Sequence, residues 1–343
     1  MSTIYITEHD ALLKIQHHYL KVFHQQKQRI CIPIRNLSQI IFFSNIHLTQ
    51  QVIQIVHSHQ IPVLYLTQNG EYLGRLENTS QLQPKYLIHQ RRHKRDIEFN
   101  RATAESMIWA KLHNQHNFLQ SWTRNYANPI TQRALNYLTL LMDNLPIATS
   151  LNQLQEYNQE ADNIYHRAIS YLLSFYNPCS HTTAKQIAKL QNLGNLLLHQ
   201  YIYTLLHTAG LHPDYAIFHP NTYELPLVWD FMAEFRAPIV DDLVFNFARN
   251  LPNSNGNGNG KKSRTVLQSF LQHWEGKLQT FVLHPYAGEV SYRQCMDLQV
   301  REYLACLLGD VEYYRPLAFK HNPAHFNFAN VGESQKAPLT LVK

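Results

Sequence analysis

The sequence predicts an α+β fold in which a small N-terminal β-sandwich domain precedes a larger all-α domain. Apolar and polar residues alternate over short stretches in the first part of the chain, whereas after Asp96 apolar residues recur with the 3.6-residue period of helices. A run of basic residues after Pro84 separates the two parts. We therefore expect a β domain over residues 1–83, a basic linker over 84–95, an all-α domain over 96–318 and a flexible tail over 319–343.

The composition is that of a folded protein. Of the 343 residues, 45% are hydrophobic and 16% are charged, which excludes a wholly disordered chain. The formal net charge of +6 favours phosphate-bearing partners without proving one. The four cysteines are widely spaced, which argues against a zinc knuckle or a disulfide framework. Since we find no apolar leader and no run of about 18 apolar residues, we expect a cytoplasmic protein that does not enter a membrane.

In the β half, the expected strands are short runs with alternating polarity or with many β-branched residues. Asn69-Gly70 is typical of a tight hairpin turn, because both residue types tolerate positive φ. Residues 50–59 have helical spacing of their apolar residues instead. The expected strands are 4–6, 30–34, 40–43, 62–66 and 71–76.

In the α half, Asn128-Pro129 is expected to begin a helix and Gly210 to end one. Residues 252–260 are rich in Asn and Gly and predict a flexible loop. The chain after Pro316 is expected to be poorly ordered. The expected helices are one that begins near Asp96, then 129–143, 152–176, 184–209, 241–249, 266–281 and 290–308.

Several phrases are more specific than this pattern. Three of them are Ala209-Gly210-Leu211-His212-Pro213, Asp230-Phe231-Met232-Ala233-Glu234-Phe235-Arg236-Ala237-Pro238, and Ser291-Tyr292-Arg293 with Gln299 after it. Others lie at 32–34, 61–64, 74–76, 111–115 and 192–194. Together, and in this order, they resemble the CRISPR-associated integrase and endonuclease of spacer acquisition, the "Cas one" family. The resemblance runs from Ile4 to about Pro316, and it implies the same N-terminal β domain and C-terminal α domain.

The resemblance implies a DNA-cutting and DNA-joining activity that depends on a divalent metal. In the joining step a DNA 3′-hydroxyl attacks a phosphodiester, and a bound Mg²⁺ or Mn²⁺ lowers the pKa of that hydroxyl and stabilises the charge that develops. These ions prefer oxygen ligands, and Mn²⁺ also accepts imidazole. The family's ligand set is a Glu, a His, and the second acid of a D-x-x-E/D phrase.

Only part of that ligand set carries over to this sequence. His219 stands at the family's His and Asp230 at the first acid of the phrase, so the resemblance makes both catalytic candidates and metal ligands. Alignment on Ala161 and Tyr165 puts Asn158 at the Glu position, and the second acid becomes Ala233.

Neighbouring acids differ in how well they could replace the lost ligands. Glu234, at i+4 from Asp230, shares its helix face and is a third candidate ligand, although it could instead pair with a surface cation such as Arg236. Glu156 and Glu160 lie two residues from Asn158, so a helix turns them away from it.

Two hypotheses follow. In the first, the protein integrates or cleaves DNA with catalysis impaired by the lost carboxylates. In the second, it is an inactive scaffold that forms a homodimer, holds the small partner of the adaptation complex (the "Cas two" family) and binds double-stranded DNA. Phosphate contacts need no metal. Candidate DNA-binding residues, each of which is more often a surface or ion-pair residue, are Arg91, Arg92, Lys94, Arg95, Arg293 and Arg301.

Overall fold

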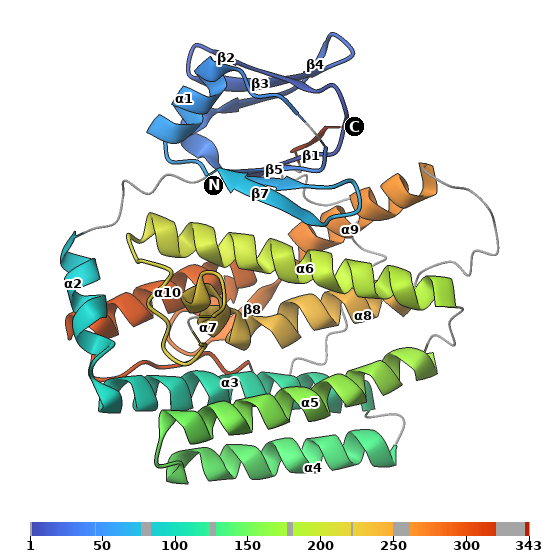
Figure 1. Ribbon diagram of the computed structural model, residues 1–343. Coiled ribbons are helices and arrows are strands. Elements are labelled where there is room, and N and C mark those ends of the chain that lie inside the picture. Colours follow the sequence, from blue (N-terminus) through green and yellow to red (C-terminus); the bar gives the residue numbers. More distant parts are fainter. Residues whose placement is uncertain are drawn as a thin grey trace. The chain divides into compact units, whose positions relative to one another are not determined.

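The computed structural model describes residues 2–44, 46–76, 84–123, 128–176, 181–220, 222–249, 261–319 and 340–342 (Figure 1). The chain divides into two compact units. The first consists of Met1–Gln81, Ser254–Glu275 and Phe328–Lys343, and the second of Leu82–Asn253 and Gly276–Asn327. The expected loop at 252–260 and most of the expected tail lie outside the described residues.

The first unit contains two β-sheets and a helix. A five-stranded sheet has the order β10-β1-β5-β6-β7, and a three-stranded sheet has the order β2-β3-β4. Helix α1 (Gln50–Ser58) connects β5 to β6, which pair in parallel. The strands are β1 (Ser2–Ile6), β2 (Leu12–Gln16), β3 (Tyr19–His24), β4 (Lys27–Pro33), β5 (Leu37–Phe42), β6 (Val63–Leu66), β7 (Tyr72–Leu76) and β10 (Thr340–Val342), and a short 3₁₀ helix, η1, covers Ile34–Asn36.

The core of this unit lies between its two sheets, as a sandwich requires. Ile4 of β1 and Ile40 of β5 share one buried cluster with Leu20 and Val22 of β3. Alternation along β1 places Tyr5 on the opposite face, where its hydroxyl donates to Glu275 at 2.6 Å. The predicted β-sandwich is therefore confirmed.

Two hairpin turns of the first unit carry no glycine or asparagine. Strands β2, β3 and β4 form an antiparallel meander. Its turns place His17 and His18 at φ of 50° and 63°, and Gln25 and Gln26 at φ of 50° and 60°. Positive φ at both central residues is normally supplied by Asn-Gly or Asp-Gly. Because these signals are absent, the sequence did not predict β2 and β3, whereas Gly70, at φ 81°, forms the predicted turn between β6 and β7.

The second unit is mainly helical, as predicted. Asn128 caps the helix that follows it by accepting from the Ile130 backbone N–H at 2.7 Å, and Gly210 adopts φ 77° two residues after another helix ends. Its helices are α2 (Pro84–His93), α3 (Ile97–Thr123), α4 (Pro129–Asn144), α5 (Leu151–Tyr176), α6 (His181–Thr208), α7 (Pro226–Phe235), α8 (Asp242–Arg249) and α10 (Tyr292–Leu308), with a 3₁₀ turn η3 (Leu145–Ile147) and a π-helical turn η4 (Arg236–Asp241).

Helix α9 and a small hairpin complete the described elements. Helix α9 covers Lys261–Gln279, and its residues up to Glu275 belong to the first unit rather than to the predicted all-α domain of 96–318. The hairpin of β8 (Phe281–His284) and β9 (Gly288–Ser291) stands where we expected the end of one helix and the start of the next. Within the described ranges, no helix is both long and apolar enough to cross a lipid bilayer.

Two segments expected to be irregular are held in place. Most of the expected linker at 84–95 is helix α2, and its Gln90 side chain exchanges two hydrogen bonds with the backbone of His212, at 3.0 and 2.9 Å. Residues 317–319 run along α3, where Asn114 donates to the Leu317 carbonyl at 3.0 Å and accepts from the Phe319 N–H at 2.9 Å. Long-range hydrogen bonds of this kind leave no local trace in the sequence.

Candidate functional site

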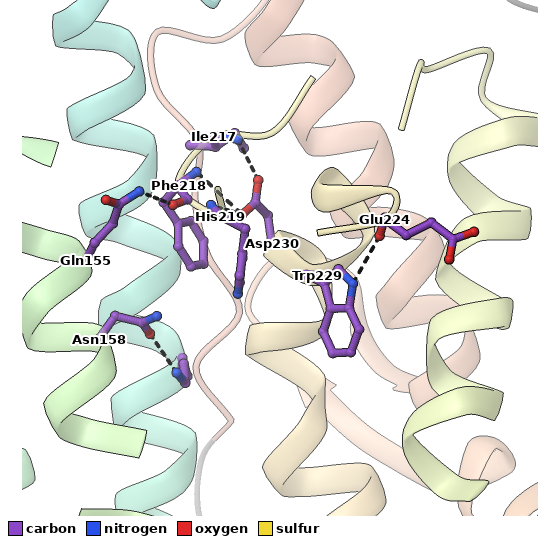
Figure 2. A network of polar contacts seen from close by, with 9 residues as sticks. Gln155, Asn158, Ile217, Phe218, His219, Glu224, Trp229 and Asp230 are labelled. Carbon is purple, nitrogen blue, oxygen red and sulfur yellow. Dashed lines mark hydrogen bonds and ion pairs between the residues drawn. The ribbon is translucent and has the colours of Figure 1, made fainter. Parts of the chain in front are cut away.

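The candidate residues gather where α3, α5 and α7 meet the loop that joins α6 to α7. His219 lies in this loop, Asp230 and Ala233 on α7, and Asn158 on α5 (Figure 2). Gln155, one helical turn before Asn158, donates to the backbone carbonyl of Phe218. That hydrogen bond ties the Asn158 face of α5 to the loop segment beside His219.

Asp230 is fully buried and holds this loop in shape. Its Oδ2 accepts from the Ile217 N–H at 2.5 Å, and its Oδ1 accepts from the N–H groups of Phe218 and His219 at 3.4 and 2.9 Å. The same Oδ1 lies 2.7 Å from Nδ1 of His219. Three of these donors converge on Oδ1 and one reaches Oδ2, and the side chain has no exposed surface. Asp230 therefore orients the loop and the imidazole, and its buried oxygens are not open to a metal ion.

His219 presents a single free nitrogen. Because an ionised carboxylate only accepts, the contact with Asp230 assigns the proton to Nδ1 and leaves the lone pair on Nε2. Nε2 makes no hydrogen bond with the residues that the structure describes, and the ring extends away from the Asp230 carboxylate (Figure 2). This geometry suits one metal bond or the acceptance of one proton.

Glu234 is also fully buried, but its oxygens serve a different part of the fold. Oε1 accepts from the Tyr314 hydroxyl at 2.6 Å, and Oε2 accepts from the Leu317 N–H at 3.0 Å and from Gln299 at 3.3 Å. Burial raises the pKa of this carboxyl to about 7, although the three donors oppose the shift. Glu234 thus joins α7 to α10 and to the segment after it, and it does not pair with Arg236 as the sequence allowed.

Asn158, which the sequence pattern aligns with the family's Glu, contacts an ammonium group. Lys111 of α3 donates to its Oδ1 at 2.6 Å and forms an ion pair with Asp162, one turn further along α5, at 2.7 Å. Burial lowers the pKa of Lys111, since water no longer stabilises its charge, while Asp162 opposes that shift. The amide oxygen of Asn158 therefore faces a resident cation.

A second buried network begins at Tyr165, which follows Asp162 on α5. Asp241 of η4 accepts from the Tyr165 hydroxyl at 2.8 Å and from Gln191, and burial raises its pKa although Arg236 opposes the shift. Burial and Arg236 lower the pKa of His166. Sequence reasoning missed this network, and it missed Lys111 as well. Residues 111–115 are one of the phrases that resemble the family, and this resemblance could have pointed to Lys111.

The remaining acids of α5 face elsewhere. Glu160 accepts from the Tyr137 hydroxyl of α4 at 3.0 Å, and Glu156 is exposed. Ala233 is 8% exposed and offers no donor atom. Across the described parts of the chain, no three His, Cys, Asp or Glu side chains come together in a group that could hold a metal ion.

The donors in reach therefore do not fit a hard divalent ion. Mg²⁺ takes about six oxygen ligands, of which carboxylates supply the charge. Here the candidates contribute one imidazole nitrogen and one amide oxygen, and a lysine already binds that oxygen. The other two candidates, Asp230 and Glu234, are fully buried, and each accepts hydrogen bonds on both oxygens.

The predicted DNA-binding residues fall into two groups. Arg91, Arg92, Lys94 and Arg95 are exposed at the C-terminal end of α2, where Arg91 Nε donates to the Tyr215 hydroxyl at 2.9 Å. On α10, the Arg293 guanidinium lies 5.5 Å from the Tyr201 ring centre, and the exposed Arg301 pairs with Asp297 at 2.9 Å. The residues of α2 thus lie on an ordered helix tied to the loop that carries His219.

Aromatic rings surround His219. Tyr223 lies 5.4 Å from the His219 ring and 5.7 Å from that of Trp229, both edge-on, and His199 of α6 lies 5.3 Å from Trp229. We call these four residues the aromatic cluster. The sequence did not predict it, because tyrosine and histidine are common throughout the chain.

Comparison with known proteins points to one family. A family model described as CRISPR associated protein Cas1 matches residues 4–275. The CRISPR-associated endonuclease Cas1 3 of Thermus thermophilus is 23% identical over 333 residues, which cover 93% of this chain and 98% of that protein.

Solved structures share the fold. A chain of a Cas6-RT-Cas1–Cas2 complex superimposes with a TM-score of 0.73 and 17% identity, over 92% of this chain and 36% of that longer one. A casposase bound to integration product gives a TM-score of 0.72 and 17% identity, over 96% of this chain and 97% of that one. At these identities the likeness concerns the fold.

Proposed function

Because the chain belongs to the family of the CRISPR-associated protein Cas1, we propose that it acts in CRISPR adaptation as a DNA-binding protein whose metal-dependent cutting and joining of DNA is impaired. Two matches support the adaptation role. The Thermus thermophilus relative is named as a CRISPR-associated endonuclease, and the casposase neighbour is bound to an integration product.

The full burial of Asp230, with both of its oxygens hydrogen-bonded to the His219 loop, is the observation that carries the impairment. A carboxylate that accepts four hydrogen bonds and has no exposed surface cannot give an oxygen to Mg²⁺ or Mn²⁺ without breaking the loop that positions His219. Ala233 and Asn158 remove two further negative charges, and Lys111 adds a positive one. A hard dication is held mainly by anionic oxygens, so binding of either ion is weak at best.

DNA binding does not depend on that ion. Arg91 and Arg92 sit on α2, and Lys94 and Arg95 follow its last residue. Gln90 and His212 fix this helix to the His219 loop, so the four exposed cations form a preformed set of phosphate contacts. We extend the proposal to double-stranded DNA bound there, with Arg293 and Arg301 as further contacts.

The protein is also proposed to work as an assembled subunit. A homodimer that holds the small "Cas two" partner would let a protein with a weak centre still position DNA. The fold neighbour in a Cas6-RT-Cas1–Cas2 complex supports such a partner. If the cell also holds a second protein of this family with an intact metal centre, this chain serves as the scaffold.

A strand-transfer assay tests the proposal. A labelled duplex with free 3′-hydroxyl ends is incubated with a supercoiled plasmid and the full-length protein, in Mn²⁺, Mg²⁺ or EDTA. We expect duplex binding in every condition and joined product close to the EDTA background. Asn158→Glu combined with Ala233→Glu restores two anionic oxygens, and we expect at least about tenfold more product in Mn²⁺.

Gln159→Glu is the matched control. Residue 159 is exposed and follows Asn158 on α5, so this variant adds negative charge without adding a ligand, and its product should remain at background. Brisk joining by the unmutated protein in Mn²⁺ would refute the impairment. Failure of the unmutated protein to retain duplex DNA in any condition would refute the DNA-binding role.

A further inference from the structure

Helix α4 carries exposed apolar side chains that nothing in the proposed function uses. The helix packs on α3 and α5 and lies at the outer edge of the helical unit (Figure 1). Its buried side faces those two helices. The large apolar residues on its other side, and on η3 directly after it, are Ile130, Tyr137, Leu140 and Ile147, each of which is at least 36% exposed. Several such residues on one face mark an interaction surface, whereas a single one would not.

The spacing along this face is that of a helix that pairs with another helix. Two polar residues complete the series, and the six form what we call the α4 stripe: Ile130, Arg133, Tyr137, Leu140, Asn144 and Ile147. The steps between them alternate between three and four residues. This alternation is the seam of a two-helix coiled coil, in which each side chain packs between residues of the facing helix.

The α4 stripe has the same order of residue types from either end: apolar, polar, apolar, apolar, polar, apolar. A second α4 laid antiparallel on the first therefore places Ile130 opposite Ile147, and Tyr137 opposite Leu140. Apolar side chains meet apolar ones at each of these levels. A two-fold interface requires such self-complementarity, because the same patch lies on both copies.

Charge along α4 fits the same arrangement. Arg133 and Asp143 are both exposed, and neither forms an ion pair within the described part of the chain. In the antiparallel pair, each Arg133 lies opposite Asn144 of the second copy and beside its Asp143, so two ion pairs form across the interface. A parallel pair would instead bring Arg133 against Arg133. The charges thus favour the antiparallel arrangement that the apolar residues indicate.

One side chain at the middle of the stripe is already held in place. The Tyr137 hydroxyl donates to Glu160 of α5 at 3.0 Å, while its ring stays partly exposed. A ring that is fixed before association loses less conformational entropy when a partner packs on it. Tyr137 is therefore suited to anchor a contact near the two-fold axis.

We propose that the α4 stripe is a contact through which two copies of this chain associate, with their α4 helices antiparallel. The proposal rests on the homodimer proposed above and names a surface for it. From 130 to 147 the stripe is about 27 Å long, and a helix is about 10 Å wide. That surface is smaller than the roughly 800 Å² per partner of a standard interface, so we expect association at micromolar concentrations rather than below them.

Sedimentation equilibrium of the full-length protein over a series of concentrations tests this contact. Arg133→Glu and Asp143→Arg should each weaken the association at least about tenfold, because each variant places like charges at two symmetric points. Lys189→Glu is the matched control, since Lys189 is exposed on α6 of the same unit and its reversal changes the net charge as Arg133→Glu does. This control should associate like the unmutated protein.

A mixture of the two variants separates this contact from any other. In a pair that combines one Arg133→Glu copy with one Asp143→Arg copy, opposite charges meet again at both symmetric points. An equimolar mixture should therefore recover the association of the unmutated protein, although each variant alone does not.

The outcomes distinguish the α4 contact from the homodimer as such. Association that is unchanged by either charge reversal, a mixture no stronger than its components, or equal weakening by Lys189→Glu would overturn the α4 contact and leave the homodimer standing. An unmutated protein that stays monomeric at every concentration would overturn both.

Discussion

Replacement of Glu234 by glutamine should change the free energy of unfolding in a pH-dependent way. Relative to the unmutated chain, the variant should gain stability as the pH rises from acidic to neutral. The Glu234 carboxyl is fully buried, and burial raises its pKa from an ordinary value near 4.5 to about 7. The folded protein therefore keeps a proton on Glu234 at pH values where the unfolded chain has lost it. Glutamine has nearly the same shape and no charge at any pH.

The sign and the size of this change in the free energy of unfolding follow from proton linkage. Below about pH 4.5 the carboxyl is protonated in both states and contributes nothing to the pH dependence. As the pH rises from there to about 7, only the folded state holds the proton, so the free energy of unfolding falls. At about 1.4 kcal/mol per pH unit, the loss reaches roughly 3 kcal/mol and is complete above about pH 7.

Urea unfolding of both proteins at pH 5 and pH 8 measures the effect. The difference between their free energies of unfolding should shift by roughly 2–3 kcal/mol in favour of Glu234→Gln at pH 8. Groups whose titration is the same in both proteins cancel in this difference. A difference that does not change with pH would refute the buried, nearly neutral carboxyl.

The same unfolding experiment with added Mn²⁺ tests whether Glu234 binds a metal ion. An ion that bound Glu234 in the folded state would stabilise the unmutated protein more than the variant. Since Tyr314, Gln299 and Leu317 already occupy its oxygens, millimolar Mn²⁺ should shift both midpoints equally. A selective shift of the unmutated protein would restore Glu234 as a ligand.

Two further predictions concern stability. Lys111→Met should cost about 3 kcal/mol, because Asp162, whose side chain keeps 31% of its surface exposed, loses its cationic partner and keeps only the Gln115 amide. Adding Asp162→Asn should recover at least about 1 kcal/mol, and a double variant no more stable than Lys111→Met would contradict the ion pair. Gln26→Gly should raise the free energy of unfolding, measured in urea, by about 0.5 kcal/mol, because glycine adopts φ 60° without strain. Gln28→Gly inside β4 should lower it, and stabilisation by both variants, or by neither, would contradict the turn geometry.

Local patterns in the sequence predicted most of the elements but missed particular ones. The helices after Asp96 emerged from apolar spacing and from caps such as Asn128, because those signals act within one helical turn. Strands β2 and β3 were missed since their turns use His17-His18 and Gln25-Gln26 at positive φ. There the meander's packing against the larger sheet outweighs the preference for Asn and Gly.

The candidate site shows the same division. The phrases of the sequence singled out His219, Asp230 and the two substituted positions, Asn158 and Ala233. They could not predict that the Asp230 carboxylate accepts hydrogen bonds from the backbone of the His219 loop, nor that Asn158 contacts Lys111. Both facts concern partners that only the folded chain brings within hydrogen-bond distance.

The sequence by itself determined the two-part architecture and the family, because periodicity, caps and residue identity are all written locally along the chain. The tertiary structure alone decided what the remaining acids do. Glu234 meets Leu317, 83 residues away, and Lys111 meets Asn158, 47 residues away. Whether a carboxylate binds a metal ion or serves the fold depends on which donors reach it first, and that is settled only when distant segments pack together.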